Sequence, residues 1–190
     1  MSHLSNAAEA MTAVVREITD DQLANKTPCT EYDVRALVNH LLFWGPAEAG
    51  AGRKESVPVP AAGESGVDLT TGDWRGDLLA LLADITSAWE PAGAWEGTTS
   101  MGSPHELPAP VLGDMITGEL AVHGWDLAVA TGQRLALPTD TLAHLHDAVS
   151  AGAAQAREMG LYGPPVAVPA DAPTLDRVVA LTGRDPAWTL

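Results

Sequence analysis

Three ionisable side chains share one face of a single predicted helix. In the stretch GELAVHGWDLA, a helical advance of about 100° per residue places Glu119, His123 and Asp126 on that face. The flanking turns extend the same face with apolar residues, namely Leu112, Met115 and Ala130. We therefore expect this face to point into a core. Burying unpaired charge costs several kcal/mol per group, so these side chains need a compensating partner.

A shared divalent cation would supply that compensation. Glu119 and His123 are spaced i, i+4, which brings their Cβ atoms to about 6 Å. A catalytic zinc site usually has three protein ligands and one open position. His40 can be the third ligand, because it lies at the edge of the apolar stripe of an earlier predicted helix. Two imidazoles and one carboxylate favour zinc over nickel or iron(II).

Further residues support this predicted site. Asp126 lies one turn beyond His123 and can accept the second N–H of a ligand imidazole, which fixes its tautomer. Trp44 and Trp125 flank the proposed ligands in sequence; they are expected in the core and can also form a pocket wall. A Glu-x-x-x-His pair alone is more typical of a solvated helix surface or of a satisfied core histidine than of a metal site; its apolar surroundings and His40 are what favour the metal. A structural bundle whose carboxylates and histidines pair with each other therefore stays open as an alternative.

Other candidate groups have simpler interpretations. Cys29 precedes a predicted helix whose dipole could lower its pKa, but no helper base is near in sequence and a buried packing role is favoured. His105, in a Pro-rich loop, could shuttle protons, although an ordinary loop histidine is the favoured interpretation. His144 and His146 diverge by about 200° on a helix, so they cannot chelate one ion. His3 is expected at a frayed terminus.

The elements that position these residues are predicted to be helices throughout. A capping box at Thr30 and Asp33 opens the second helix, and Gly45 and Pro46 are expected to end it. Residues 46–72 are read as a long surface loop, and 91–110 as an extended segment that could hold a short strand pair. The predicted helices, from apolar periodicity, cover residues 4–18, 34–42, 73–90, 111–130, 139–160 and 174–183. The fifth of these is predicted to bury Met159. This predicts an all-α helix bundle.

Composition narrows the function classes. The chain has 190 residues, 46% hydrophobic content and a formal charge of −15, with Lys26 and Lys54 as its two lysines. One domain is expected, and nucleic-acid or anionic membrane partners are disfavoured. A single cysteine excludes an internal disulfide, and no signal peptide or long apolar run is evident, so a cytoplasmic location is expected. No glycine-rich phosphate loop follows a strand, which disfavours nucleotide-binding folds.

Three segments together resemble a known family. TPCTEYDVRALVNHL, GELAVHGWDLAVATG and YGPPVAVPADAPTLDRVVALTGRDPAW are similar to an actinobacterial branch of the DinB-like superfamily. That branch resembles the N-terminal metal-binding domain of mycothiol-dependent maleylpyruvate isomerase. The resemblance implies a DinB-like four-helix bundle over residues 1–165, with a tail, 166–190, packed on it in the same domain and carrying a short helix. It also implies one divalent metal, with zinc favoured, bound by His40, Glu119 and His123.

The resemblance also suggests the chemistry. The metal would lower the pKa of a bound thiol, such as mycothiol, or of water, for transfer, isomerisation or hydrolysis. Arg35 and Arg75 are the nearest cationic candidates in sequence for binding an anionic ligand. The isomerase's second, C-terminal domain has no counterpart after residue 165, so maleylpyruvate isomerisation itself is not expected. A non-catalytic metal-binding or small-ligand-binding stress-response protein is the alternative, and a homodimer stays open.

Overall fold

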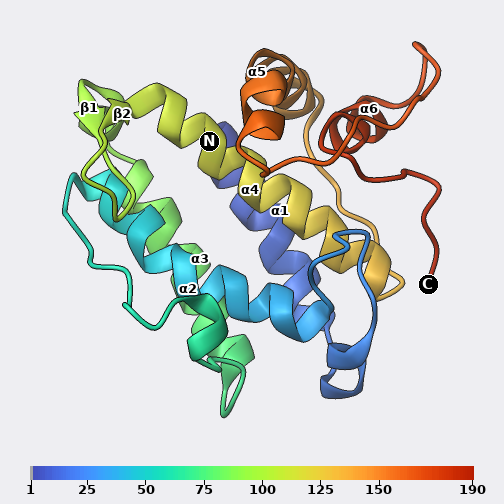
Figure 1. Ribbon diagram of the computed structural model, residues 1–190, viewed down its shortest axis with the longest axis horizontal. Coiled ribbons are helices and arrows are strands. Elements are labelled where there is room, and N and C mark those ends of the chain that lie inside the picture. The colour runs from blue at the N-terminus through green and yellow to red at the C-terminus, as the bar shows by residue number, and fades with distance from the viewer. Residues whose placement is uncertain (1) are drawn as a thin grey trace.

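The computed structural model describes residues 2–190, and its architecture is helical (Figure 1). The all-α fold predicted from the sequence is confirmed. Over the described residues the α-helices are α1 (His3–Glu17), α2 (Val34–Arg53), α3 (Trp74–Trp89), α4 (Ala109–Ala130), α5 (Thr139–Glu158) and α6 (Thr174–Leu181). Short 3-10 helices cover Asp20–Ala24, Glu64–Gly66 and Ala92–Trp95.

The first four helices form a closed bundle. Helix α2 packs on α3, α3 packs on α1, α1 packs on α4, and α4 returns to α2. Their buried faces meet in one apolar core, in which Leu37, Leu78 and Leu120 are almost fully buried. Helix α5 packs on α4 and α1, and α6 packs on α5, so the C-terminal segment covers the α1–α4 side of the bundle (Figure 1).

Helix α2 is longer than its sequence suggests. The break predicted at Gly45 and Pro46 is wrong, because the helix continues through both residues to Arg53. Gly45 serves close packing instead of a turn: a Cβ there would lie 2.3 Å from Cδ2 of Leu81 on α3. Gly52 is equally tight, since its Cβ would lie 2.8 Å from the carbonyl oxygen of Ala88. This packing against α3 outweighs the backbone hydrogen bond that a proline cannot make.

The loop predicted at 46–72 therefore begins later, after Lys54. It runs back along α2 and is attached to it by side chains. Asn39 donates to the backbone oxygen of Glu64 at 3.3 Å and accepts from the backbone N–H of Leu69 at 2.7 Å. Arg35 donates to Thr70 Oγ1 at 2.8 Å. These bonds hold the 3-10 turn that carries Glu64 against the middle of α2.

A short hairpin precedes α4. Strands β1 (Thr98–Thr99) and β2 (Leu107–Pro108) pair in antiparallel register, which confirms the short strand pair considered for this segment. The hairpin delivers the chain to the first turn of α4, where Pro108 is the N-cap residue. Across residues 2–190, the structure contains no helix that is both long enough and apolar enough to span a membrane.

Two apolar residues expected in the core are exposed. Met115 is 45% exposed, whereas its predicted companions Leu112 and Ala130 are buried. Met115 lies one turn before Glu119, whose side chain is also partly exposed. Met159, assigned to the buried stripe of the fifth helix, is 63% exposed because α5 ends at Glu158 and the helical pattern stops there.

Candidate metal centre

Helix α2 presents His40 towards α4. The helix begins at Val34, and its N-cap is Asp33, whose Oδ1 accepts from the backbone N–H of Ala36 at 2.9 Å. The capping box expected with Thr30 is therefore corrected to a single aspartate cap. Two turns into the helix, His40 is largely buried, with 16% of its side chain exposed. The cap and the packed face of α2 fix the direction in which this imidazole points.

Helix α4 brings the other two predicted ligands to the same point. Nε2 of His40 lies 2.8 Å from Oε1 of Glu119, and Nε2 of His123 lies 3.2 Å from that same oxygen. One ligand atom from each of the three residues lies within 4.8 Å of the other two. The structure thus brings together His40, Glu119 and His123, although 79 residues separate His40 from Glu119 in the sequence.

The Nδ1 atom of each imidazole contacts a carboxylate. Nδ1 of His123 lies 2.9 Å from Oδ2 of Asp126, as the spacing predicted. Nδ1 of His40 lies 2.9 Å from Oε2 of Glu64, a residue that the sequence did not single out. A carboxylate accepts hydrogen bonds, so each imidazole carries a proton on Nδ1. When the rings are neutral, both Nε2 atoms therefore direct lone pairs at the Glu119 carboxylate.

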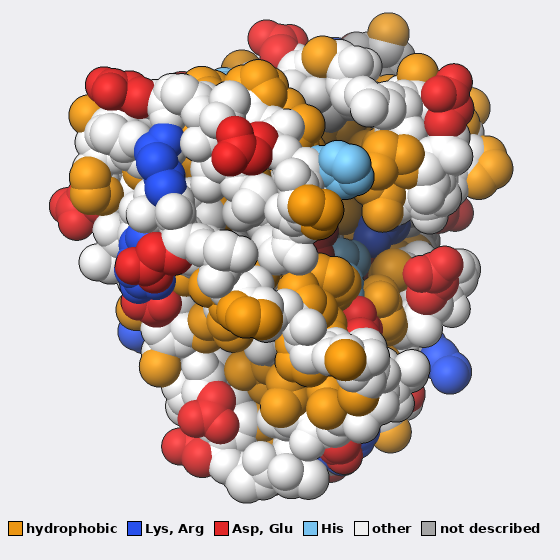
Figure 2. Space-filling view, turned by 60° about the vertical axis from the view of Figure 1, so that its left-hand side comes forward, with side chains coloured by type: hydrophobic (Ala, Val, Ile, Leu, Met, Phe, Trp, Pro, Cys, Tyr) orange, Lys and Arg blue, Asp and Glu red, His pale blue; other side chains and the backbone are white. Residues whose placement is uncertain are grey.

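This donor set fits a divalent cation. Two neutral Nε2 atoms and a carboxylate oxygen are typical ligands of zinc, and carboxylate partners on Nδ1 are the usual support for metal-binding histidines. The side chain of Glu119 remains 30% exposed, so the group of donors opens towards solvent on one side. Figure 2 shows a hollow on this side of the molecule, with histidine, acidic and basic side chains at depth among hydrophobic ones.

Without a cation, the donors compensate one another by taking up protons. Burial opposes a charged His123, but Glu119 and Asp126 outweigh it and raise the pKa of His123 to about 10. Burial likewise works against Glu119 ionisation, yet His123 and His40 together hold the Glu119 pKa well below its usual range. The pKa of His40 is raised by Glu119 and Glu64 against the effect of burial. A bound cation would take the place of these protons.

The C-terminal segment contributes a residue that the sequence analysis missed. Arg184, after α6, donates to Oδ2 of Asp126 at 3.1 Å and lies 3.4 Å from its Oδ1 through Nε. Asp126 is fully buried, so the guanidinium balances a charge that would otherwise be unpaired. The contacts of Asp126 with Arg184 and with His123 therefore link the C-terminal segment to the centre of the bundle.

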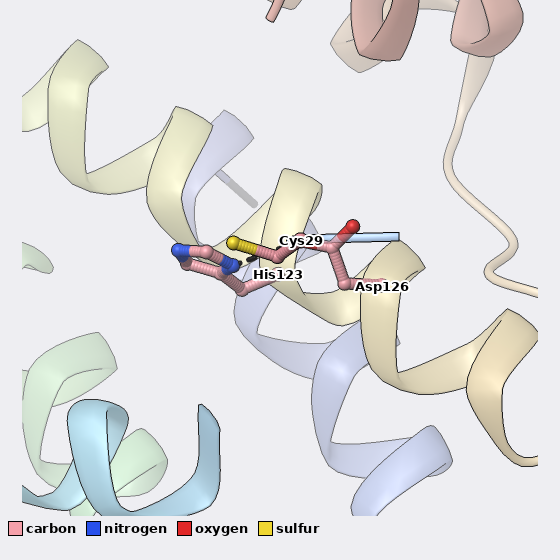
Figure 3. A group of neighbouring side chains, drawn as sticks. All are labelled: Cys29, His123 and Asp126. Carbon is pink, nitrogen blue, oxygen red and sulfur yellow. Dashed lines mark hydrogen bonds and ion pairs between the residues drawn. The ribbon is translucent and has the colours of Figure 1, made fainter. Parts of the chain in front are cut away.

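Cys29 lies next to the imidazole ring of His123. Its Sγ, a ring nitrogen of His123 and an oxygen of Asp126 lie within 4.8 Å of one another (Figure 3). The ionisable neighbours that could not be found near Cys29 in sequence are thus supplied by α4, but both ring nitrogens of His123 already have other partners, Asp126 and Glu119. Burial is the dominant influence on this thiol and raises its pKa, in spite of the nearby positive charges of Arg184 and His123. The cysteine is therefore a thiol in the resting protein.

Glu48 is a second acidic residue that the sequence did not indicate. It lies two turns after His40 on α2 and is only 4% exposed. Across residues 2–190 its carboxyl group has no hydrogen-bond or ion-pair partner. Burial, together with the negative charge of Glu119, raises the pKa of Glu48 to about 8. Glu48 is therefore largely protonated near neutral pH.

The two predicted wall residues differ in position. Trp44 donates from Nε1 to Oε2 of Glu64 at 3.1 Å, so its indole lies beside the support of His40. Trp125 is buried in the apolar core, two residues after His123 and therefore on another side of α4. Tyr32 completes the surroundings of His40, with its hydroxyl 3.2 Å from Nδ1.

The remaining candidates lie elsewhere. Within residues 2–190, two clusters of histidine, cysteine and acidic side chains are compact enough to share an ion, and both contain His123. His105 is exposed, and His144 bonds to Asp114 and stacks on His3. The cationic candidates bind other partners: Arg35 contacts Thr70, and Arg75 contacts the Ile18 carbonyl and Asp20.

Comparisons with known proteins place this geometry in context. The family model described as mycothiol maleylpyruvate isomerase N-terminal domain matches residues 4–128, a span that contains the three donors. Uncharacterised proteins of Mycobacterium tuberculosis, from strains H37Rv and CDC 1551, are each 27% identical over 97% of this chain and 96% of their own length. No solved structure matches the chain. The predicted resemblance to the isomerase-like branch is thereby confirmed.

Proposed function

This chain belongs to the mycothiol maleylpyruvate isomerase N-terminal domain family, and on that premise we propose that His40, Glu119 and His123 bind one divalent cation, with zinc favoured. We further propose that the site uses a low-molecular-weight thiol, of the mycothiol type, in a transfer, isomerisation or hydrolysis reaction. The observation that carries the proposal is the convergence of two Nε2 atoms on one carboxylate oxygen, at 2.8 and 3.2 Å.

Each residue then has a role that follows from its position. His40 and His123 supply neutral nitrogen ligands because Glu64 and Asp126 hold their Nδ1 protons. Glu119 supplies the anionic ligand and faces the opening to solvent. When bound, the cation would lower the pKa of a thiol and so supply a nucleophile near neutral pH. Glu48 is placed to hold a proton close to this centre.

A thiol titration tests the proposal. Purified protein is loaded with cobalt(II), freed of excess metal and titrated with a small thiol, while thiolate-to-cobalt absorption is recorded in the near ultraviolet. We expect a saturable band with one cobalt per chain, and its absence from the His123→Ala variant. A cobalt-loaded protein whose spectrum does not respond to any thiol would contradict the thiol part of the proposal. Thiol binding without turnover of electrophilic test compounds would instead support the non-catalytic alternative.

A further inference from the structure

A second cluster of possible metal ligands shares His123 with the candidate metal centre. Its members are Cys29, His123 and Asp126, and one ligand atom of each lies within 4.8 Å of the other two (Figure 3). Nδ1 is the ring nitrogen that can complete this set, because it bonds to Asp126 at 2.9 Å while Nε2 is directed at Glu119. A sulfur, a nitrogen and an oxygen donor therefore lie together outside the first site, which is the set His40, Glu119 and His123.

The loop before α2 holds Cys29 in this position. Thr27 Oγ1 donates to the carbonyl oxygen of Cys29 at 3.0 Å and to that of Tyr32 at 2.6 Å. The backbone N–H of Tyr32 also donates to the Cys29 carbonyl, at 3.0 Å. Cys29 is partly exposed, and with Thr30 and Tyr32 it lines a surface pocket of about 400 Å³. A cation therefore has a route from solvent to this residue.

One divalent cation could replace two protons here without changing the charge of the cluster. In the metal-free protein, burial keeps Cys29 a neutral thiol, and His123 carries a proton on each ring nitrogen because each faces a carboxylate. A cation between the sulfur and Nδ1 would displace the thiol proton and the Nδ1 proton. Asp126 would keep Arg184 as its counter-ion, since the guanidinium also lies 3.4 Å from Oδ1 of Asp126.

We propose that Cys29, Nδ1 of His123 and Asp126 form a second metal site, which takes soft, thiophilic cations of the cadmium(II) class and excludes a cation from the first site. Soft cations prefer thiolate sulfur, and the first site offers them only nitrogen and oxygen. The second site stands on its own geometry, whereas the exclusion rests on the proposed function.

The two sites exclude each other through the tautomer of His123. A neutral imidazole has one nitrogen with a free lone pair and one that carries a proton. A cation on Nδ1 therefore leaves the ring proton on Nε2, where it is donated to Glu119. The first site then lacks one of its two nitrogen ligands.

Cadmium titration of the metal-free protein, without added thiol, tests the second site. The chain has one cysteine, so thiolate-to-cadmium absorption in the ultraviolet reports on Cys29 alone. We expect a saturable band at one cadmium per chain, absent from Cys29→Ser and strongly weakened in His123→Ala. His40→Ala is the matched control, because it removes a ligand of the first site and should keep the band. A native protein without the band, or a band that His123→Ala leaves unchanged, would overturn the proposal.

Zinc displacement tests the exclusion. Zinc-loaded protein is freed of excess metal and titrated with cadmium in the presence of a zinc-sensitive dye. Loss of a residue that merely supports a ligand costs about tenfold or more in metal affinity, so the native protein should release zinc at a cadmium concentration at least about tenfold lower than Cys29→Ser does. Cys29→Ser should still bind zinc, because the first site is intact.

The two measurements separate the possible failures. A thiolate-to-cadmium band that appears while the zinc is retained would overturn the exclusion. A native protein that shows the band but binds no zinc would support the second site and show that the proposed function itself has failed.

Discussion

The imidazole of His40 and the carboxylate of Glu64 meet at 2.9 Å, although 24 residues separate them and Glu64 lies on a loop. The same carboxylate accepts from the indole of Trp44, so two α2 side chains fix its position. Together with Asp126 behind His123, this contact gives both candidate ligands a carboxylate partner on Nδ1. The two helices therefore present their Nε2 lone pairs towards Glu119 as a matched pair.

Removing the Glu64 carboxylate should weaken metal binding. Glu64→Gln leaves the three donors in place but replaces the charged acceptor of the His40 Nδ1 proton by a neutral amide, whose NH2 group can face the ring instead, so zinc affinity should fall about 10- to 100-fold. Competition with a chromophoric chelator measures this change. Asp114→Asn is the control, because Asp114 contacts His144 on the surface in a similar way at 2.7 Å. Equal affinities for Glu64→Gln and the native protein would show that the loop carboxylate has no part in the site.

Arg184 should stabilise the fold through Asp126. Arg184→Met leaves a fully buried aspartate without its cation, which should lower the free energy of unfolding by about 3–5 kcal/mol. The double variant Arg184→Met with Asp126→Leu should recover much of that loss, because no unpaired charge remains. Metal affinity should stay weakened in the double variant, because His123 has lost its Nδ1 acceptor.

Chemical denaturation of the metal-free proteins measures this effect. Arg53→Gln provides a surface comparison, since Arg53 and Asp84 are both more than one-third exposed and such pairs contribute about 1 kcal/mol or less. A cost for Arg184→Met no greater than that of Arg53→Gln would contradict the assigned role.

The metal-free protein should lose stability at alkaline pH. The pKa of His123 is raised from 6.5 to about 10 in the folded protein, so its charged form stabilises the fold fully below 6.5. That contribution disappears as the pH rises through about 10. Thermal unfolding in the presence of a chelator should show a larger fall in Tm between pH 7 and 10 for the native protein than for His123→Asn. Parallel curves for the two proteins would contradict the raised pKa.

Metal affinity should rise with pH, whereas the stability of the metal-free protein should fall. Because the ligand imidazoles must be neutral, cation binding displaces their protons, and apparent affinity should rise from pH 6 to 9. Calorimetry in buffers of different ionisation enthalpy would detect the released protons. Binding that releases no protons would be inconsistent with imidazole ligands whose pKa values are raised.

Glu48 should destabilise the folded protein above mildly acidic pH. The pKa of Glu48 is about 8 in the folded protein, against 4.5 for an ordinary glutamate such as that of the unfolded chain. As the pH increases, the unfolded chain therefore ionises first. Relative to Glu48→Gln, the native protein should lose on the order of 3–4 kcal/mol between pH 5 and 8. Denaturant unfolding at both pH values measures the difference, with Glu90→Gln as an exposed control. If the difference in unfolding free energy between the native protein and Glu48→Gln were the same at both pH values, the raised pKa of Glu48 would be contradicted.

Helical periodicity predicted the central donors because it constrains residues on one helix. Glu119, His123 and Asp126 follow from the i, i+3 and i, i+4 spacings of α4, and His40 follows from the apolar stripe of α2. Glu64 could not be found in this way. It lies in a segment without a repeating pattern, and its position depends on the contacts of Asn39 with the loop.

Tertiary packing explains the other differences from the sequence prediction. Arg184 is brought to Asp126 by the docking of the C-terminal segment, across 58 residues of sequence. Gly45 and Pro46 are typical of a helix end, yet close contact between α2 and α3 keeps the chain helical there. Glu48 was hidden because a single acidic residue after a predicted break reads as part of a solvated loop.

Metal analysis of the purified protein tests the central claim most directly. The native protein, His123→Ala and Glu119→Gln are each equilibrated with zinc, passed through a desalting column and measured by elemental mass spectrometry. We predict about one zinc per chain in the native protein, in line with three-ligand zinc sites, and strongly reduced content in both variants. Equal zinc content in all three proteins, whether high or close to zero, would contradict a cation shared by His40, Glu119 and His123.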